Sequence, residues 1–178
     1  MDPLVGPTEE SNWLIPGKLI VGSCPITLEE MEDIAKKGGD DLLVCLLDRD
    51  DFSSHISKKD YNKLARAAKM EVIFKPIADG DITSDKRASS IAWMVYEALN
   101  EDDRIVYLHC WGGHGRAGTI GAMVLGLWYR TPFVEAIAFL QKSHQTRLEG
   151  GNYPTPQTKE QINQVLRFYR KENISICP

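Results

Sequence analysis

Short, almost wholly apolar runs alternate with amphipathic helical segments along this chain of 178 residues. The apolar runs lie at 19–21, 42–47, 72–74 and 105–108. Strands that are apolar on both sides are typical of parallel sheets whose two faces are covered. The alternation therefore predicts an α/β fold with a mainly parallel central sheet, flanked by helices on both faces.

The helical segments carry start signals. Thr27 and Glu30 have the spacing of a capping box, and the helix they open is expected to end at 38–39, where two glycines follow each other. Thr131 before Pro132 predicts another start, a cap followed by proline at the first helical position. Further helices are expected at 59–69, 84–99 (capped by Thr83 or Ser84), 116–129 and 159–171.

Composition limits the possible functions. Apolar residues make up 43% and charged residues 26% of the chain, as in ordinary soluble globular proteins. The length suits one domain with its own core, so we expect a flexible N-terminal tail at 1–12 and a single domain at 13–178. The net charge of −4 disfavours a general nucleic-acid or anionic-membrane binder, although it leaves room for a local basic pocket.

The four cysteines, Cys24, Cys45, Cys110 and Cys177, match no zinc pattern and no compact disulfide framework. No apolar run approaches the ~20 residues that cross a membrane. The acidic N-terminal segment lacks the basic and apolar regions of a signal peptide. Free thiols without an export signal predict a reducing compartment, and hence a cytoplasmic protein.

The segment from Cys110 to Arg116 joins a strand to a helix and contains glycines at 112, 113 and 115. Glycine allows successive backbone N–H groups to converge on one point, and the helix adds its free N–H groups and the positive end of its dipole. Together they predict a nest for a phosphate or sulfate ion. The same field stabilises a thiolate at Cys110, and the planar fork of Arg116 fits two phosphate oxygens.

The pattern His109-Cys110-x5-Arg116 resembles the signature of the protein tyrosine phosphatase superfamily, in particular its compact dual-specificity branch. The resemblance covers roughly 13–169. It implies that Cys110 attacks phosphorus and forms a phosphocysteine intermediate, that Arg116 binds substrate and transition state, and that His109 helps to stabilise the thiolate. The implied substrate-binding positions are Trp111, Gly112, Gly113, His114, Gly115 and Arg116.

A leaving alkoxide or phenoxide needs a proton from a general acid. The candidates, Asp79 and Asp81, follow the strand predicted at 72–74, so they lie at the same sheet edge as Cys110. Their segment resembles the acid loop of the cyclin-dependent-kinase-associated phosphatase and its relatives, in which the aspartate before glycine is the acid. We therefore assign the role to Asp79 and keep Asp81 as the alternative.

One position departs from the family pattern. The loop arginine is usually followed by Ser or Thr, whose hydroxyl helps the cysteine sulfur leave in the second step, whereas Ala117 stands here, as in the phosphatases of regenerating liver. Thr119 is expected on a different helix face. Losing a hydrogen bond of about 1.5–3 kcal/mol predicts about ten- to hundredfold slower phosphocysteine hydrolysis. Gln157 resembles a water-placing glutamine of some relatives, and the alternative is a solvated residue before a helix.

Four other residues carry expectations. Arg147 is expected to tie loops together, as arginines do at this place in similar sequences. His55 and His144 lie in polar stretches beside helices and are expected to be solvated. Cys45 is expected to approach Cys110 from a neighbouring strand, where a redox role is open.

The resemblance implies a phosphatase that hydrolyses phosphotyrosine in proteins, with phosphoserine and phosphothreonine as further substrates. The partner is then a phosphorylated protein, and no metal or other cofactor is needed. Two alternatives remain open. One is a phosphatase of small phosphorylated metabolites or inositol phosphates. The other is a weakly active phosphate-binding pseudophosphatase, which the absent hydroxyl at Ala117 keeps in view.

Overall fold

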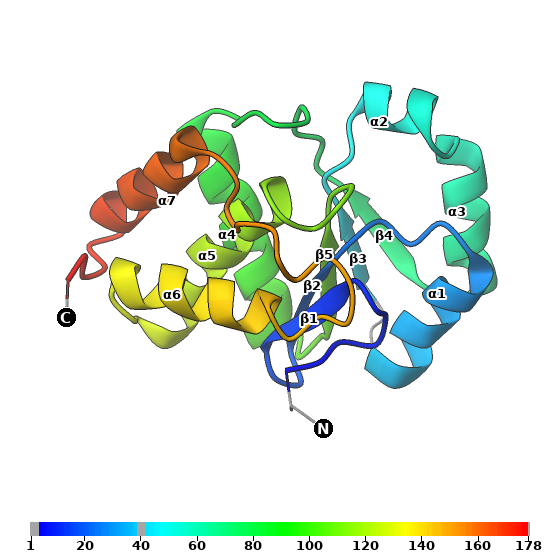
Figure 1. Cartoon of the computed structure of the whole chain (residues 1–178), viewed down its shortest axis with the longest axis horizontal. Coiled ribbons are helices and arrows are strands. Elements are labelled where there is room, and N and C mark those ends of the chain that lie inside the picture. The colour runs from blue at the N-terminus through cyan, green and yellow to red at the C-terminus, as the bar shows by residue number, and fades with distance from the viewer. Residues whose placement is uncertain (1–3, 39–41, 178) are drawn as a thin grey trace.

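The computed structural model describes residues 4–38 and 42–177. At its centre lies a five-stranded sheet in the order β1 (Ser11–Ile15), β2 (Leu19–Gly22), β5 (Val106–His109), β3 (Leu42–Cys45) and β4 (Glu71–Phe74) (Figure 1). All neighbours are parallel except β1, which pairs antiparallel with β2 at the edge. The predicted mainly parallel α/β fold is confirmed.

The central strands supply two separate hydrophobic cores, because successive side chains of a strand point to opposite faces. One core contains Leu19, Val21, Leu42, Val44, Val106 and Leu108, and the other contains Ile20, Leu43, Cys45 and Tyr107. Helices α4 (Asp85–Asn100), α5 (Arg116–Tyr129), α6 (Phe133–His144) and α7 (Lys159–Lys171) pack on the first face (Figure 1). Helices α1 (Leu28–Asp33) and α3 (Lys58–Ala67) cover the second.

The sheet brings the segments that follow its four parallel strands to one edge. β5 is the middle strand, so the chain that leaves it at His109 lies between the chains that leave β2 and β3. After β3 comes α2 (Arg49–Ser54), a short helix that the sequence patterns do not predict. After β4 comes the segment at 76–81. In parallel sheets this carboxyl edge is where ligands bind.

The predicted helix starts are confirmed with one exception. Thr27 and Glu30 form the expected capping box of α1, and a π-helical turn, Ile34–Gly38, follows it; Gly39 lies outside the described residues. Ser84, not Thr83, caps α4. The prediction for Thr131 is wrong: Pro132 has φ −58° and ψ 147°, an extended conformation, so it occupies the cap position and α6 begins one residue later.

Helix α5 is buried from Arg116 to Leu127, as its almost wholly apolar sequence predicts. It is 14 residues long. Within the part of the chain that the structure describes, no helix combines the length and the apolar character needed to cross a bilayer.

The expected flexible tail at 1–12 is wrong in its last two residues. Ser11 and Asn12 begin β1, pair with Gly22 and Val21, and are almost fully buried. Ser11 bonds within its own turn and Asn12 accepts a hydrogen bond from Arg147, which offsets the cost of burying these polar side chains. Residues 1–3 lie outside the described part, and the single-domain organisation at 13–178 stays a prediction.

Candidate active site

The loop from Cys110 to Gly115 leaves the carboxyl end of β5 and leads directly into α5. Gly113 has φ +73°, and a Cβ there would collide with the Gly22 carbonyl of β2, so this position requires glycine. The backbone N–H groups of residues 111–115 donate to no carbonyl of the described residues. Successive free donors before a helix N-terminus form the anion nest that the sequence predicts.

The loop lines a cavity of about 340 Å³, within the roughly 300–1,000 Å³ typical of small-molecule sites. Four residues singled out from the sequence, Cys110, Arg116, Asp79 and Gln157, line it together, although they are distant along the chain. Cys110 is 3% exposed. The structure thus brings the predicted nucleophile, phosphate ligand, acid and water-placing residue to one pocket.

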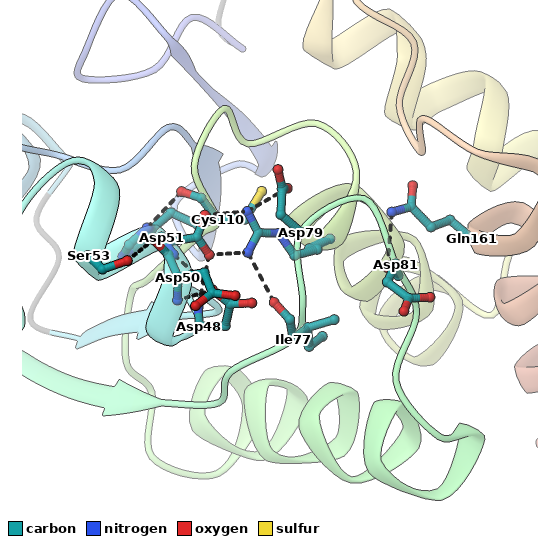
Figure 2. A network of polar contacts seen from close by, with 11 residues as sticks. Asp48, Asp50, Asp51, Ser53, Ile77, Asp79, Asp81, Cys110 and Gln161 are labelled. Carbon is teal, nitrogen blue, oxygen red and sulfur yellow. Dashed lines mark hydrogen bonds and ion pairs between the residues drawn. The ribbon is translucent and has the colours of Figure 1, made fainter.

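Arg116 is held by carboxylates from two sides. Its Nη1 and Nη2 atoms donate to both oxygens of Asp51 at 2.5 and 3.1 Å, and Nη1 also donates to the Ile77 carbonyl at 3.0 Å (Figure 2). Its Nη2 lies 2.7 Å from Oδ1 of Asp79. The Nε atom is buried and has no partner among the described residues. A buried, unpaired donor on a side chain that lines the nest marks a place for an anion.

Asp51 is a site residue that the sequence analysis missed. It lies on α2, where Asp48 and Asp51 form a reciprocal capping box, and its side chain is 5% exposed. Burial opposes its ionisation, but hydrogen bonds from Arg116 and from the Asp48 backbone hold the pKa of Asp51 below its ordinary value. Although burial alone would lower it, the bond to Asp51 and nearby negative charge raise the pKa of Arg116 above its ordinary value.

A signal for Asp51 was present in the sequence. Asp48-x-x-Asp51 has capping-box spacing directly after a buried strand, at the sheet edge where Cys110 also lies. That spacing locates a helix start, but it does not say which basic residue the second carboxylate would meet.

The two candidate acids lie differently. Asp79 lines the pocket and approaches Cys110 in Figure 2, whereas Asp81 lies away from the sulfur, where its backbone carbonyl accepts from Gln161. The Asp79 side chain is 74% exposed. Gln157 also lines the pocket, and Gln161 holds it in place by accepting from its backbone N–H at 3.0 Å.

His109 is fully buried behind the loop, and burial lowers the pKa of His109 to about 4, so its ring is neutral near pH 7. Its Nδ1 lies 3.1 Å from the Cys110 carbonyl, which only accepts, and its Nε2 lies 2.6 Å from the Tyr61 hydroxyl. The neutral ring therefore donates through Nδ1 and accepts from Tyr61 through Nε2. His109 supports the loop as a neutral hydrogen-bonding group.

Trp111 stacks on His55 at the end of α2, with ring centroids 3.8 Å apart and an interplanar angle of 12°. His55 is exposed, as expected, yet it serves this contact. The loop is thus joined to α2 twice, through this stack and through the pair of Arg116 with Asp51.

His144 is buried, so the expectation that it would be solvated is wrong. Its Nε2 lies 2.7 Å from Nδ1 of His114 and its Nδ1 lies 3.2 Å from the Gly151 carbonyl. The neutral His144 ring therefore donates to the Gly151 carbonyl through Nδ1 and accepts from His114 through Nε2, which stabilises this polar ring inside the molecule. Burial and the neighbouring charge of Arg147 lower the pKa of His114 to about 4 and that of His144 to about 3, so neither ring adds positive charge near pH 7.

Arg147 ties loops together, as expected. Its guanidinium donates to the Gly112 and Gly113 carbonyls of the loop, to the Val21 carbonyl of β2 and to the Asn12 side chain, at 2.7–3.2 Å. Burial lowers the pKa of Arg147 to about 10, which leaves it charged near pH 7.

Ala117 is fully buried in the core next to the loop. The Thr119 hydroxyl donates to the Gly115 carbonyl at 2.8 Å, within its own helix. Thr119 therefore does not take the place of the hydroxyl that is absent at position 117.

Cys45 lies opposite His109 in the sheet register, one position before Cys110. Burial raises the pKa of Cys45 to about 12, and burial likewise raises the pKa of Cys24. Both are neutral thiols near pH 7, and a redox role for Cys45 stays a prediction.

These observations agree with the comparison to known families. Residues 8–174 match a family model described as PTP-SAK, the DSP-PTPase phosphatase domain of Swiss Army Knife proteins. The chain belongs to this family, and it is a phosphatase domain of the compact dual-specificity type. No curated protein sequence matches it significantly.

Several solved structures share the fold. Tk-PTP in its active form has a TM-score of 0.72 and 21% identity, with 91% of this chain and 97% of that chain covered. Kinase-associated phosphatase (KAP) has a TM-score of 0.70 and 21% identity, covering 86% of each chain. PTPMT1 in complex with PI(5)P has a TM-score of 0.70 and 14% identity, covering 92% and 96%.

Proposed function

We propose that this protein is a cysteine-dependent phosphatase that hydrolyses phosphotyrosine, and also phosphoserine and phosphothreonine, in proteins. The observation that carries the proposal is the Nε of Arg116, which has no hydrogen-bond partner within residues 4–38 and 42–177. It is a buried cationic donor beside loop N–H groups that bond to no backbone carbonyl of these residues, with Cys110 in the same pocket. This arrangement suits a phosphate monoester held with its phosphorus above a thiolate.

In the first step the Cys110 thiolate attacks phosphorus, the S–P bond forms, and the bond from phosphorus to the ester oxygen breaks. Asp79 gives its proton to the leaving oxygen. The bound phosphate displaces the Asp79 carboxylate from Arg116, since both are anions competing for the same guanidinium, and the displaced Asp79 takes up from solvent the proton that it then gives to the leaving oxygen. This exchange frees Asp79 for the leaving group.

In the second step a water attacks the phosphocysteine, Asp79 takes the proton, and the S–P bond breaks to release phosphate. Gln157 lies in the pocket where it can orient that water. Ala117 offers the departing sulfur no hydrogen bond, so this step is the slower one.

The substrate class follows from what the loop lacks. Between Cys110 and Arg116 the loop carries the side chains of Trp111 and His114, with glycine at the other positions and no lysine. Because the pKa of His114 is about 4, this ring does not supply positive charge even at mildly acid pH. A singly phosphorylated group therefore fits the pocket better than an inositol polyphosphate.

The decisive experiment compares the wild-type protein with Cys110→Ser on an aryl phosphate, a panel of phosphopeptides and a panel of inositol phosphates. We expect hydrolysis of the aryl phosphate and the phosphopeptides by the wild type only, with a phosphoenzyme detectable by mass spectrometry after rapid quenching. Preferential hydrolysis of inositol phosphates would overturn the proposal that the substrates are phosphorylated proteins. Activity that survives in Cys110→Ser, or that is absent from the wild type, would overturn the mechanism.

A further inference from the structure

A second cavity, of about 570 Å³, adjoins the catalytic pocket. We call it the acidic groove; its walls are the segment at 6–10, the start of α1 and the pair Leu148 and Glu149. Glu10 lines both the groove and the catalytic pocket. Anything attached to a phosphate in the pocket on this side must therefore pass Glu10.

Much of the negative charge in the groove is not neutralised. Glu30 is used in the capping box of α1, and Asp33 pairs with Lys37 at 2.7 Å. Four further carboxylates that line the groove have no ion-pair partner among the described residues; they are Glu9, Glu10, Glu29 and Glu149.

Arg147, a second cation near the groove, uses its hydrogen-bond donors in other contacts. Arg147 lies behind the loop, and its guanidinium donates to Gly112, Gly113, Val21 and Asn12. It holds the loop and forms no ion pair with the groove carboxylates among the described residues, but its charge attracts that of Glu10, so the negative charge of Glu10 is partly offset. A cationic ligand would be attracted to the groove, and an anionic one would be repelled.

An independent feature shows where the anionic part of that ligand lies. Arg116 is 2% exposed, lines the catalytic pocket and has an Nε donor without a partner in the part of the chain that the structure describes. A phosphate bound there fixes the substrate at one end. The groove then receives the neighbouring part of the same molecule.

The rim of the groove is also apolar in places. Leu148 is 69% exposed on the groove wall, and Ile26 and Leu28, which flank the groove residue Thr27, are 47% and 41% exposed. Lysine and arginine carry long aliphatic stems below their charged ends. The exposed Leu148 beside the Glu149 carboxylate on the groove wall matches both parts of such a side chain.

We infer that the substrate is a protein segment with lysine or arginine next to the phosphorylated residue, which the acidic groove binds while the phosphate occupies the Cys110 loop. The inference rests on the proposed function and narrows it. The same field disfavours substrates with further phosphates or acidic residues at that side.

The test uses three phosphotyrosine peptides that differ only in flanking residues, which are arginine, alanine or glutamate. For the wild-type protein we expect kcat/KM to fall in that order, with at least about a tenfold ratio between the arginine and glutamate peptides at low salt. The ratio should shrink as salt is raised, because exposed charges are screened. Equal rates, or preference for the glutamate peptide, would overturn the inference.

Variants locate the source of the preference. The double variant Glu9→Gln and Glu149→Gln, and separately Glu10→Gln, should bring the ratio toward one. Glu97→Gln, which removes the same charge from the exposed side of α4, should leave the ratio unchanged. A preference that persists in the groove variants would exclude the groove as its cause.

The proposed function can fail separately. Hydrolysis of an aryl phosphate without hydrolysis of any of the three peptides would exclude protein substrates and, with them, this inference. Hydrolysis of all three peptides at equal rates would keep the proposed function and overturn only the role of the groove.

Discussion

Behind the Cys110 loop, carbonyls and rings are tied to several elements: Arg147 donates to two loop carbonyls, His109 bonds the Cys110 carbonyl, and the Thr155 hydroxyl donates to the His114 carbonyl. In front of the loop, the Nε of Arg116 has no hydrogen-bond partner among the described residues, and the N–H groups of 111–115 donate to none of their backbone carbonyls. The hydrogen bonds behind the loop fix the direction of its N–H groups. At the front of the loop these N–H groups remain available to a ligand. Preorganised donors of this kind stabilise charge without reorganising during the reaction.

Arg116 shows the same contrast within one side chain. On the back, Asp51 binds it with both oxygens and is 5% exposed; on the front, Asp79 binds it with one and is 74% exposed. A buried pair is costly to break, whereas an exposed pair contributes about 0–1 kcal/mol. Asp51 is therefore a positioning residue, and Asp79 can exchange with substrate.

The largest expected effect follows from breaking the pair at the back. Asp51→Asn removes the buried counter-charge of Arg116 and leaves the guanidinium with the exposed Asp79 carboxylate, so we expect the free energy of unfolding to fall by about 3–5 kcal/mol. Denaturation in urea measures this loss. Asp50→Asn, on the exposed side of the same helix, is the matched control. Similar stabilities of Asp51→Asn and Asp50→Asn would show that the Asp51 carboxylate does not stabilise Arg116 as a buried counter-charge.

Removing the carboxylate at the front should leave the fold intact and impair the reaction. Asp79→Asn is expected to change the free energy of unfolding by no more than about 1 kcal/mol, while kcat on alkyl phosphates falls by about 10²–10⁴ because the proton donor is lost. Aryl phosphates should lose less, since their leaving groups need a proton less. A larger loss in Asp81→Asn than in Asp79→Asn would reverse the assignment of the acid.

The buried residues behind the loop should also make the stability of the protein depend on pH. Burial places the pKa of His109 at about 4 in the folded protein, against 6.5 for an unperturbed histidine. The unfolded chain therefore binds this proton first as the pH falls. The stability contribution is complete above about pH 6.5 and is lost toward pH 4, by roughly 3 kcal/mol for this residue.

Unfolding in urea at a series of pH values tests this prediction, with His109→Asn as the comparison. The depressed pKa values of His114 and His144 act in the same direction, so the variant should retain part of the acid sensitivity. Identical slopes against pH in the wild type and the variant would mean that His109 is not buried as a neutral ring.

The front of the site was largely predictable from the sequence, and the back was not. Cys110, Arg116 and their glycines are contiguous, so a local pattern specifies the nest that they form. Arg147 was expected to tie loops only because similar sequences do so. Asp51 and Tyr61 approach the loop through strand order and helix placement, which pair residues 65 and 48 positions apart. No local sequence pattern, such as helical or strand periodicity, predicts contacts between residues so far apart in the chain.

The errors in the fold have a similar origin. Asn12 was placed in a flexible tail, and His144, in a polar stretch, was expected in solvent, but both are buried. Each is satisfied by a distant or loop partner: Arg147 for Asn12, and His114 with Gly151 for His144. A polar sequence indicates that burying the segment would cost free energy. The three-dimensional structure is needed to show the hydrogen bonds that offset this cost.

The smallest expected effect concerns the hydroxyl that the front of the site lacks. In Ala117→Ser, a hydroxyl next to the loop can donate to the departing sulfur, and we expect phosphocysteine hydrolysis to speed up about ten- to hundredfold, from a hydrogen bond of about 1.5–3 kcal/mol to a charged group. In rapid-quench experiments the wild type should show a burst and trapped phosphoenzyme, both diminished in the variant. The rate constant of the burst reports the first step. This rate constant should change little, because Asp79 and Arg116 still carry out the first step. Equal steady-state rates without a burst in either protein would place the slow step before the intermediate, and the front of the loop would then be complete without that hydroxyl.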